Sequence, residues 1–305
     1  MPINIPDRLP AVELLKKENI FVMNAMRALK QDIRALRLAL LNLMPLKIDT
    51  ETDLVRVLSN SPLQVELDLI GLKSHKSKNT PIEHIREFYI DFDEIKGQKY
   101  DGIIVTGAPV EHLAFEDVTY WEELTQIFDW AKTHVTAGMF ICWSAQAALY
   151  HYYGIKKYPL EKKMFGIFEH TLNAPLNPLF RGFDDVFYAP HSRYTEIRRE
   201  DIAKTPELDI LSESKEAGIY IVSAREGREI FITGHSEYAP ETLDNEYRRD
   251  LAKQLPIEIP HSYYKDNNPD NPPLVRWRSH ANLLFQNWLN YFVYQITPYH
   301  IGTIR

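Results

Sequence analysis

The sequence is poor in cysteine, with only Cys142 among 305 residues. One thiol cannot form an internal disulfide or a cysteine-rich metal site, which favours the reducing cytoplasm as its location. The first residues, MPINIPDRLPAVELLKKEN, lack a basic start followed by an apolar run, so no signal peptide is expected. No apolar stretch approaches the roughly 20 residues of a membrane span, and we expect no membrane partner.

Common cofactor motifs are missing as well. No G-x-G-x-x-G follows a predicted strand and no G-x-x-x-x-G-K-[ST] is found, so a dinucleotide or P-loop site is not expected. None of the 11 histidines belongs to H-E-x-x-H or a similar close pair, which leaves a metal site without support. The net charge of −7, with scattered Lys and Arg, argues against a nucleic-acid partner. We therefore predict no permanently bound cofactor or metal.

The first half of the chain alternates buried strands with helices. Hydrophobic content of 45% and charged content of 25% are ordinary for a soluble globular protein. Thr50 and Asp53 have the spacing of a capping box at the start of the first helix, and Gly154 ends the last. The strands are predicted over 38–44, 63–72, 102–106 and 137–143, and the helices over 48–60, 117–134 and 144–153. This alternation predicts an α/β fold with a largely parallel sheet covered by helices on both faces.

The second half predicts shorter strands at 184–194 and 208–214, and a hairpin that turns at Arg225, Glu226 and Gly227. Residues 261–277 are rich in Pro and Asn and predict a surface loop, and 279–300 predicts a final amphipathic helix. No linker divides the chain. We expect one domain over 1–305, with an irregular N-terminal arm (1–35) and a C-terminal part (255–305) made of the Pro-rich loop and the helix.

Three strand ends carry residues suited to chemistry, and the carboxyl ends of parallel strands share one edge of a sheet. Cys142 lies where a strand becomes a helix, and the helix N-terminus favours a thiolate there. His235 and Glu237 follow the strand of the hairpin, and their i, i+2 spacing lets a carboxylate orient an imidazole. Glu111 follows the strand at 102–106. Each residue alone also fits a plainer role: core cysteine, surface histidine, solvated acid. Together they favour a Cys-His-Glu hydrolase or acyltransferase.

Six longer segments of the chain are distinctive: LNLMPLKIDTETDLVRVLSNSPLQVEL, YDGIIVTGAPVE, FICWSAQAALYHYYGI, APHSRYTE, FITGHSEYAPETLDNEYRRD and NPPLVRWRSHANLLFQNWLNYFVYQ. They resemble the homoserine O-acyltransferases of the MetA family, and the resemblance extends over essentially the whole chain. These enzymes make O-acylhomoserine from an acyl-CoA at the entry to methionine biosynthesis.

The resemblance implies a flavodoxin-like fold similar to the triad glutamine amidotransferases. It makes Cys142 the acyl-accepting nucleophile, His235 the general base and Glu237 its partner, with a thioester intermediate in a ping-pong reaction. The amidotransferases usually have glycines on both sides of the nucleophile, whereas Ile141 and Trp143 flank Cys142 here. This departure speaks against a glutaminase activity.

The resemblance also assigns the substrates. Arg249 matches the residue that grips the carboxylate of L-homoserine, and Lys163 and Ser192 match substrate-contacting positions. Without the family, Lys163 and Arg249 would pass for solvated charges. For the oxyanion, we expect backbone N–H groups of Trp143 and around two further residues, Leu46 and Lys47.

Glu111 matches the position that separates succinyl-using members, which have a Gly there, from acetyl-using ones. A carboxylate beside the acyl pocket would repel succinyl and fill its space, so we predict acetyl-CoA as the donor. The alternatives are a homoserine O-succinyltransferase, an amidase or glutaminase of the same fold, and a catalytically silent binding protein. Family members are often homodimers, but core packing explains the apolar face of the last helix equally well.

Overall fold

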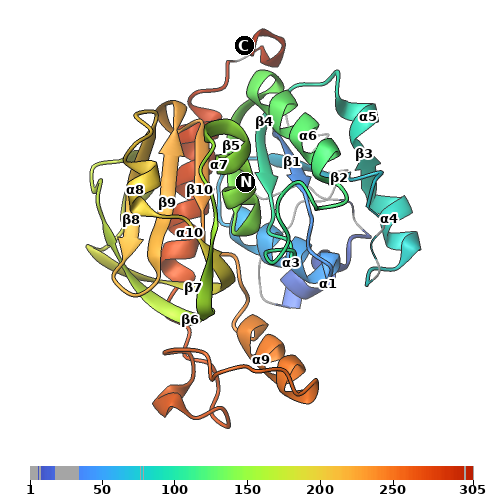
Figure 1. The fold of residues 1–305 in the computed structure, drawn as a ribbon. Helices are drawn as coiled ribbons and strands as arrows, with labels where there is room; N and C mark the ends of the chain where they lie inside the picture. The colour runs from blue at the N-terminus through green and yellow to red at the C-terminus, as the bar shows by residue number, and fades with distance from the viewer. Residues whose placement is uncertain are drawn as a thin grey trace.

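The computed structural model describes residues 6, 8–17, 34–75, 77, 79–298 and 300–304. Within them, ten strands form one sheet in the order β3-β2-β1-β4-β5-β10-β9-β8-β6-β7, and the strands from β3 to β8 in that order run from right to left in Figure 1. The strands are β1 (Leu36–Leu41), β2 (Val65–Gly71), β3 (Tyr89–Asp91), β4 (Tyr100–Val105), β5 (Val135–Ile141), β6 (Tyr158–Leu172), β7 (Val186–Glu196), β8 (Leu208–Ser214), β9 (Gly218–Ala224) and β10 (Glu229–Ile232).

The sheet has a parallel half and an antiparallel half. The strands from β3 to β10 in that order pair in parallel, and the pairs beyond β10 are antiparallel. Every residue of β4 and β5 is buried, as expected for apolar strands covered on both faces. The predicted parallel α/β sheet is confirmed.

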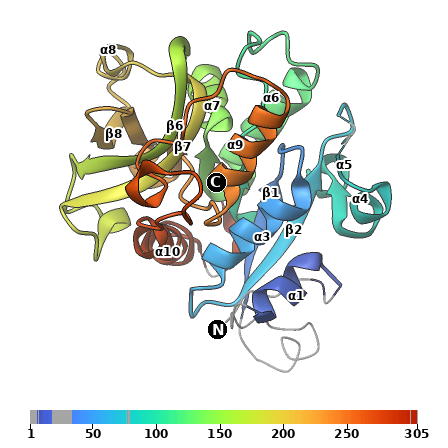
Figure 2. The ribbon, with the colours of Figure 1, turned by 90° about the horizontal axis from the view of Figure 1, so that it is seen from below.

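Helices cover both faces of the sheet (Figures 1 and 2). One core cluster contains residues of α1, α3, α10 and η4, and the other contains residues of α5, α6, α7 and α8. The helices are α1 (Pro10–Lys17), α3 (Lys47–Leu58), α4 (Ile82–Phe88), α5 (Phe92–Ile95), α6 (Trp121–His134), α7 (Trp143–Tyr153), α8 (Arg199–Ile202), α9 (Thr242–Ala252) and α10 (Arg278–Asn287), which continues as the π-helical η4 (Trp288–Tyr294). Among the described residues, no helix is long and apolar enough to cross a bilayer.

The hairpin is confirmed, and the final helix is confirmed in position but ends at Tyr294 instead of residue 300. β9 and β10 pair antiparallel around a turn in which Glu226 has a φ of 58°. The first predicted helix is right in position but wrong at its start, because α3 begins at Lys47 and Thr50 and Asp53 lie inside it. The Thr50 hydroxyl donates to the carbonyl of Leu46 at 3.1 Å instead of capping the helix. The capping-box interpretation is therefore wrong.

The N-terminal arm is not wholly irregular. Residues 10–17 form α1, which buries Ala11, Val12 and Leu15 in the core cluster shared with α3. Residues 1–5, 7 and 18–33 of the predicted arm lie outside the described residues. An apolar stripe at helical spacing explains why this segment packs as a helix.

The order of the strands brings several loops together at one edge of the sheet. β1 pairs with β2 on one side and with β4 on the other. The order in which successive strands are added to the sheet therefore reverses between β1 and β4. In open parallel sheets, ligands bind outside the carboxyl ends of strands next to such a reversal. The loops after β4, β5 and β10 carry Glu111, Cys142 and His235, respectively.

Candidate active site

Cys142 occupies a strained position between β5 and α7. Its backbone has φ 56° and ψ −116°, a region that L residues rarely adopt, and such conformations cost about 1–3 kcal/mol. Its N–H donates to the carbonyl of Ile232 at 2.6 Å, and its own carbonyl accepts from Ala145 at 3.1 Å. Hydrogen bonds on both sides of the turn therefore maintain the strained backbone conformation. This conformation places the Cys142 thiol at the start of α7.

The turn around Cys142 is packed tightly against β4 and the loop that follows it. A Cβ atom on Gly107 would lie 3.2 Å from the Cβ atom of Cys142 and 3.7 Å from its Sγ. The Ser144 hydroxyl accepts from the N–H of Ile141 at 3.0 Å and donates to the carbonyl of Val105 at 2.7 Å. These contacts fix the direction of the thiol.

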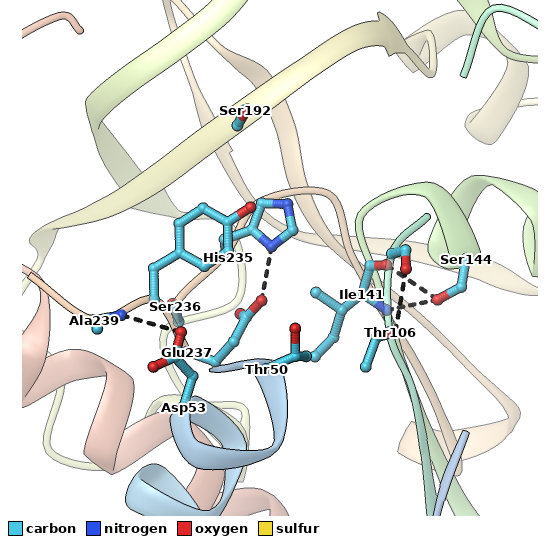
Figure 3. Close-up of polar contacts among 12 residues, drawn as sticks. Thr50, Asp53, Thr106, Ile141, Ser144, Ser192, His235, Ser236, Glu237 and Ala239 are labelled. Carbon is cyan, nitrogen blue, oxygen red and sulfur yellow. Dashed lines mark hydrogen bonds and ion pairs between the residues drawn. The ribbon is translucent and has the colours of Figure 1, made fainter. Parts of the chain in front are cut away.

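His235 and Glu237 complete a buried triad with Cys142. The Nδ1 atom of His235 lies 2.7 Å from Oε1 of Glu237 (Figure 3), and the imidazole is also hydrogen-bonded to the side chain of Cys142. Cys142 is 4% exposed, His235 3% and Glu237 7%. The ring of Tyr238 stacks on the imidazole with centroids 4.1 Å apart. The structure thus brings together the three residues that the sequence predicted as a catalytic set.

The charges of the triad favour a protonated imidazole. Burial acts to lower the pKa of His235, but negative charge on Cys142 and Glu237, and hydrogen bonds to both, raise it well above its ordinary value. A proton that leaves the thiol is therefore retained on the imidazole. Transfer of the thiol proton to this imidazole would give a thiolate–imidazolium pair, the reactive form of a catalytic cysteine.

Helix α3 supports the carboxylate side of the triad. In Figure 3, Thr50 and Asp53 lie below Glu237. The carboxylate of Asp53 accepts from Arg56 at 2.7 Å and from the N–H of Ala239 at 3.4 Å, which ties the loop after Glu237 to the helix. Burial raises the pKa of Asp53 to about 7, although Arg56 opposes the shift. Asp53 therefore binds the loop after Glu237 and does not cap α3.

Three predicted substrate residues converge on one acid that the sequence analysis missed, Glu246 of α9. The Glu246 carboxylate accepts from Lys163 at 2.7 Å and from the hydroxyl of Ser192 at 2.8 Å. The Arg249 guanidinium lies 3.4 Å from Glu246 and donates to Asp250 at 2.7 Å. Lys163 comes from β6 and Ser192 from β7, so these two contacts join α9 to both strands. The cluster presents cations and an anion side by side.

Glu111 lies within electrostatic range of the triad. Burial raises the pKa of its carboxyl, and the charges of His235, Lys163 and His112 act against the shift. Its loop is fastened by Lys157, whose ammonium donates to the carbonyl of Glu111 at 2.7 Å. The Glu111 carboxyl therefore interacts electrostatically with both the imidazole and Lys163.

The predicted oxyanion donors differ in their surroundings. Trp143 is the first residue of α7, where an N–H has no acceptor within the helix. The N–H of Lys47 faces the hydroxyl of Thr80 at 3.4 Å and would have to leave it to hold an oxyanion. Burial lowers the pKa of the Lys47 ammonium to about 8, against the charge of Glu51. The side chain of Leu46 is 51% exposed.

In the described ranges, no three His, Cys, Asp or Glu side chains group as a metal ion would require.

Solved structures share this architecture. A glutamine amidotransferase from Thermotoga maritima superposes with a TM-score of 0.56 at 13% identity, covering 86% of this chain and 100% of its own. A glutamine amido transferase from Methylobacillus flagellatus gives a TM-score of 0.51 at 12% identity, with 84% and 95% covered. At this identity the likeness concerns the fold, and it confirms the predicted flavodoxin-like, amidotransferase-like class.

Curated relatives match at high identity over the full length. The chain is 68% identical to a homoserine O-acetyltransferase of Bacteroides thetaiotaomicron, with 100% of both chains covered. It is 61% identical to a homoserine O-acetyltransferase of Acetivibrio thermocellus, again with 100% of both covered. The family model described as homoserine O-succinyltransferase (HTS) matches residues 2–299. On this full-length match, the chain belongs to the homoserine O-succinyltransferase family of acyltransferases.

Proposed function

We propose that this protein is a homoserine O-acetyltransferase that moves the acetyl group of acetyl-CoA to the hydroxyl of L-homoserine through a thioester on Cys142. The observation that carries the proposal is the buried Cys142–His235–Glu237 hydrogen-bonded set at the start of α7. The full-length relatives named homoserine O-acetyltransferase support the choice of substrates. We place the reaction in the cytoplasm, as the entry step of methionine biosynthesis, and in a single domain that spans the chain.

The first half-reaction loads the enzyme. The Cys142 thiolate attacks the carbonyl carbon of the acetyl thioester, and the tetrahedral oxyanion forms beside the N–H groups at the start of α7. The bond to the CoA sulfur then breaks, and the imidazolium of His235 supplies the proton that the departing thiolate takes. One thioester replaces another, so little free energy is gained or lost.

The second half-reaction transfers the acetyl group. His235 accepts the hydroxyl proton of homoserine as that oxygen attacks the acetyl-enzyme, and the Cys142 thiolate leaves. Glu237 holds the imidazole in orientation and balances its charge, as its 2.7 Å contact with Nδ1 requires. The low exposure of the three side chains limits the access of water, which would otherwise hydrolyse the thioester.

The charge cluster around Glu246 suits an amino-acid substrate. Free homoserine carries a carboxylate and an ammonium on one carbon, so it needs a cation and an anion close together. Arg249 and Lys163 can bind the carboxylate of homoserine, and Glu246 can bind its ammonium group. The half-exposed Arg249 would then give up its 3.4 Å contact with Glu246 and bind the substrate carboxylate instead. This arrangement favours a zwitterionic acceptor over a simple alcohol.

Acetyl-CoA alone should acetylate the enzyme once, because the first half-reaction needs no acceptor. Intact-protein mass measurement after this incubation is expected to show a gain of one acetyl group, located on Cys142. Added homoserine should return the mass to its starting value and release an equal amount of O-acetylhomoserine. If product forms only when both substrates are present and no acetylated protein accumulates, transfer is direct and the thioester scheme is wrong.

Glu246→Gln should raise the KM for homoserine by about 10- to 100-fold, because a charge-assisted hydrogen bond contributes about 1.5–3 kcal/mol. Loading by acetyl-CoA should change little, since Glu246 contacts the acceptor cluster rather than the triad. Steady-state kinetics and the single-turnover loading rate measure the two effects separately. Glu258→Gln is the matched control, because Glu258 pairs with the neighbouring Lys162 at 2.6 Å in an exposed position. If the two variants changed the KM for homoserine equally, Glu246 would not belong to the homoserine-binding site.

A further inference from the structure

Arg193 is a buried arginine that donates hydrogen bonds to uncharged groups. It is 2% exposed and lies on β7. Its guanidinium donates to the carbonyl of Thr195 at 2.7 Å, to the carbonyl of Ala217, and to Nδ1 of His191 at 3.4 Å. In the part of the chain that the structure describes, no carboxylate lies within ion-pair distance of it. A buried charge without a counter-ion is costly, so this cation requires an explanation.

The surroundings of Arg193 do not neutralise it. Burial and the charge of Arg193 lower the pKa of His191 well below its ordinary value, so that ring stays uncharged. Burial acts to lower the pKa of Arg193 itself, and negative charge on Cys142, followed by Glu196 and Glu111, opposes this effect. Among these three groups, a negative charge on Cys142 would therefore act most strongly on Arg193.

Hydrogen bonds connect Arg193 to the nucleophile and to the base. The Thr195 carbonyl that accepts from Arg193 also accepts from the Gln146 side chain at 3.2 Å. Gln146 lies in the first turn of α7, and its N–H donates to the carbonyl of Cys142 at 3.3 Å. On the same strand as Arg193, the carbonyl of Pro190 accepts the N–H of His235 at 2.8 Å. Strand β7 therefore packs directly behind the triad and carries a fixed positive charge there.

We propose that Arg193 is a positioning residue of the active site, whose buried charge stabilises the Cys142 thiolate and makes the reactive ion pair electrically balanced. When the thiol proton moves to His235, the site holds two anions, Cys142 and Glu237, and one cation, His235. This is a net negative charge in a buried place. Over these four side chains alone, Arg193 brings the sum to zero. The inference rests on the proposed role of Cys142 as nucleophile, and it adds a residue outside the triad.

Iodoacetamide alkylation tests this charge directly, because the thiolate is the reacting form and the chain has one cysteine. His235, Arg193 and Tyr238 are the charged and titratable groups on whose pKa negative charge at Cys142 acts. In Arg193→Gln, the pH of half-maximal alkylation should rise by about one to two units, since a nearby opposite charge shifts ionisation by about 1–3 units. Near pH 6 this corresponds to about 10-fold slower alkylation or more.

Arg193→Lys keeps the charge, and its alkylation profile should return most of the way to that of the wild type. Arg228→Gln is the matched control, because Arg228 also donates to backbone carbonyl groups, those of Thr136 at 2.8 Å and Val135 at 3.2 Å. That control should leave the midpoint unchanged.

Two results would overturn the proposal: a folded Arg193→Gln protein with an unshifted midpoint, or equal loss of reactivity in the Gln and Lys variants at every pH. If Arg193→Gln does not fold, the Lys variant decides alone, because a structural role would slow its alkylation without regard to charge. Alkylation needs no acetyl transfer. Failure of the proposed enzyme activity would therefore leave this measurement intact and be recognised separately.

Discussion

Replacement of Cys142 by alanine should lower the rate of acetyl transfer by about ten-thousandfold or more, the range seen when a covalent nucleophile is removed. The fall is expected in kcat and kcat/KM alike, because no thioester can form. Acetyl-CoA should leave no covalent adduct on this variant. Steady-state assays of O-acetylhomoserine, with intact-protein mass measurement beside them, give both readouts.

The fold of the Cys142→Ala protein should survive, because deleting one sulfur at a strand end leaves a small cavity worth about 1 kcal/mol. The backbone strain remains, since alanine adopts a φ of 56° no more readily than cysteine does. Far-ultraviolet circular dichroism and a thermal melt provide the control. A folded alanine variant that keeps more than a hundredth of the wild-type rate would mean that the thiol is not the acetyl carrier.

Glu111→Gly should shift the choice of acyl donor towards succinyl-CoA by up to about a thousandfold. Two like charges about 4 Å apart repel by about 4 kcal/mol at an effective dielectric constant of 20, and about 1.4 kcal/mol corresponds to a factor of ten. The ratio of kcat/KM for succinyl-CoA and acetyl-CoA measures the effect. In the wild type, we expect preference for acetyl to grow with pH, because the raised pKa of Glu111 delays the ionisation of its carboxyl.

Glu111→Gln separates charge from size, since it removes the repulsion but keeps the volume of the side chain. It should recover part of the shift, and its donor preference should no longer follow pH. Asp117→Gly is the control, because Asp117 is an exposed acid further along the same loop. If wild-type protein uses both donors equally well, the assignment of acetyl-CoA is wrong whatever the variants do.

Much of the fold was predictable because its central strands carry runs of apolar residues and its covering helices have clear periodicity. β4 and β5 are buried along their whole length, and the glycine that ends α7 adopts a φ of 70° as a helix end requires. β6 was missed because Pro159 and the charged run from Glu161 to Lys163 hide a strand that is partly exposed. α9 was missed because few of its residues are apolar, so its sequence lacks the apolar periodicity that indicates a helix packed on a core.

The candidate site was predictable where local spacing determines geometry. The i, i+2 relation of His235 and Glu237, and the placement of Cys142 between a strand and a helix, both follow from short-range rules. Glu246 was missed because its partners Lys163 and Ser192 lie 83 and 54 residues away in the sequence. Arg193 was missed because its role depends on burial, which the local sequence does not indicate. Had a helix been predicted from Thr242, the acid and Arg249 at i, i+3 would have appeared on one side of it.

The unusual backbone at position 142 has a consequence for how such proteins diverge. The energetic penalty belongs to the main chain, so every side chain placed there inherits it and only glycine escapes it. Natural selection can tolerate that penalty only while the sulfur performs its reaction. A descendant freed from the reaction would be expected to drift to glycine at this one position and become more stable, so the residue found there reports whether a lineage still uses the site.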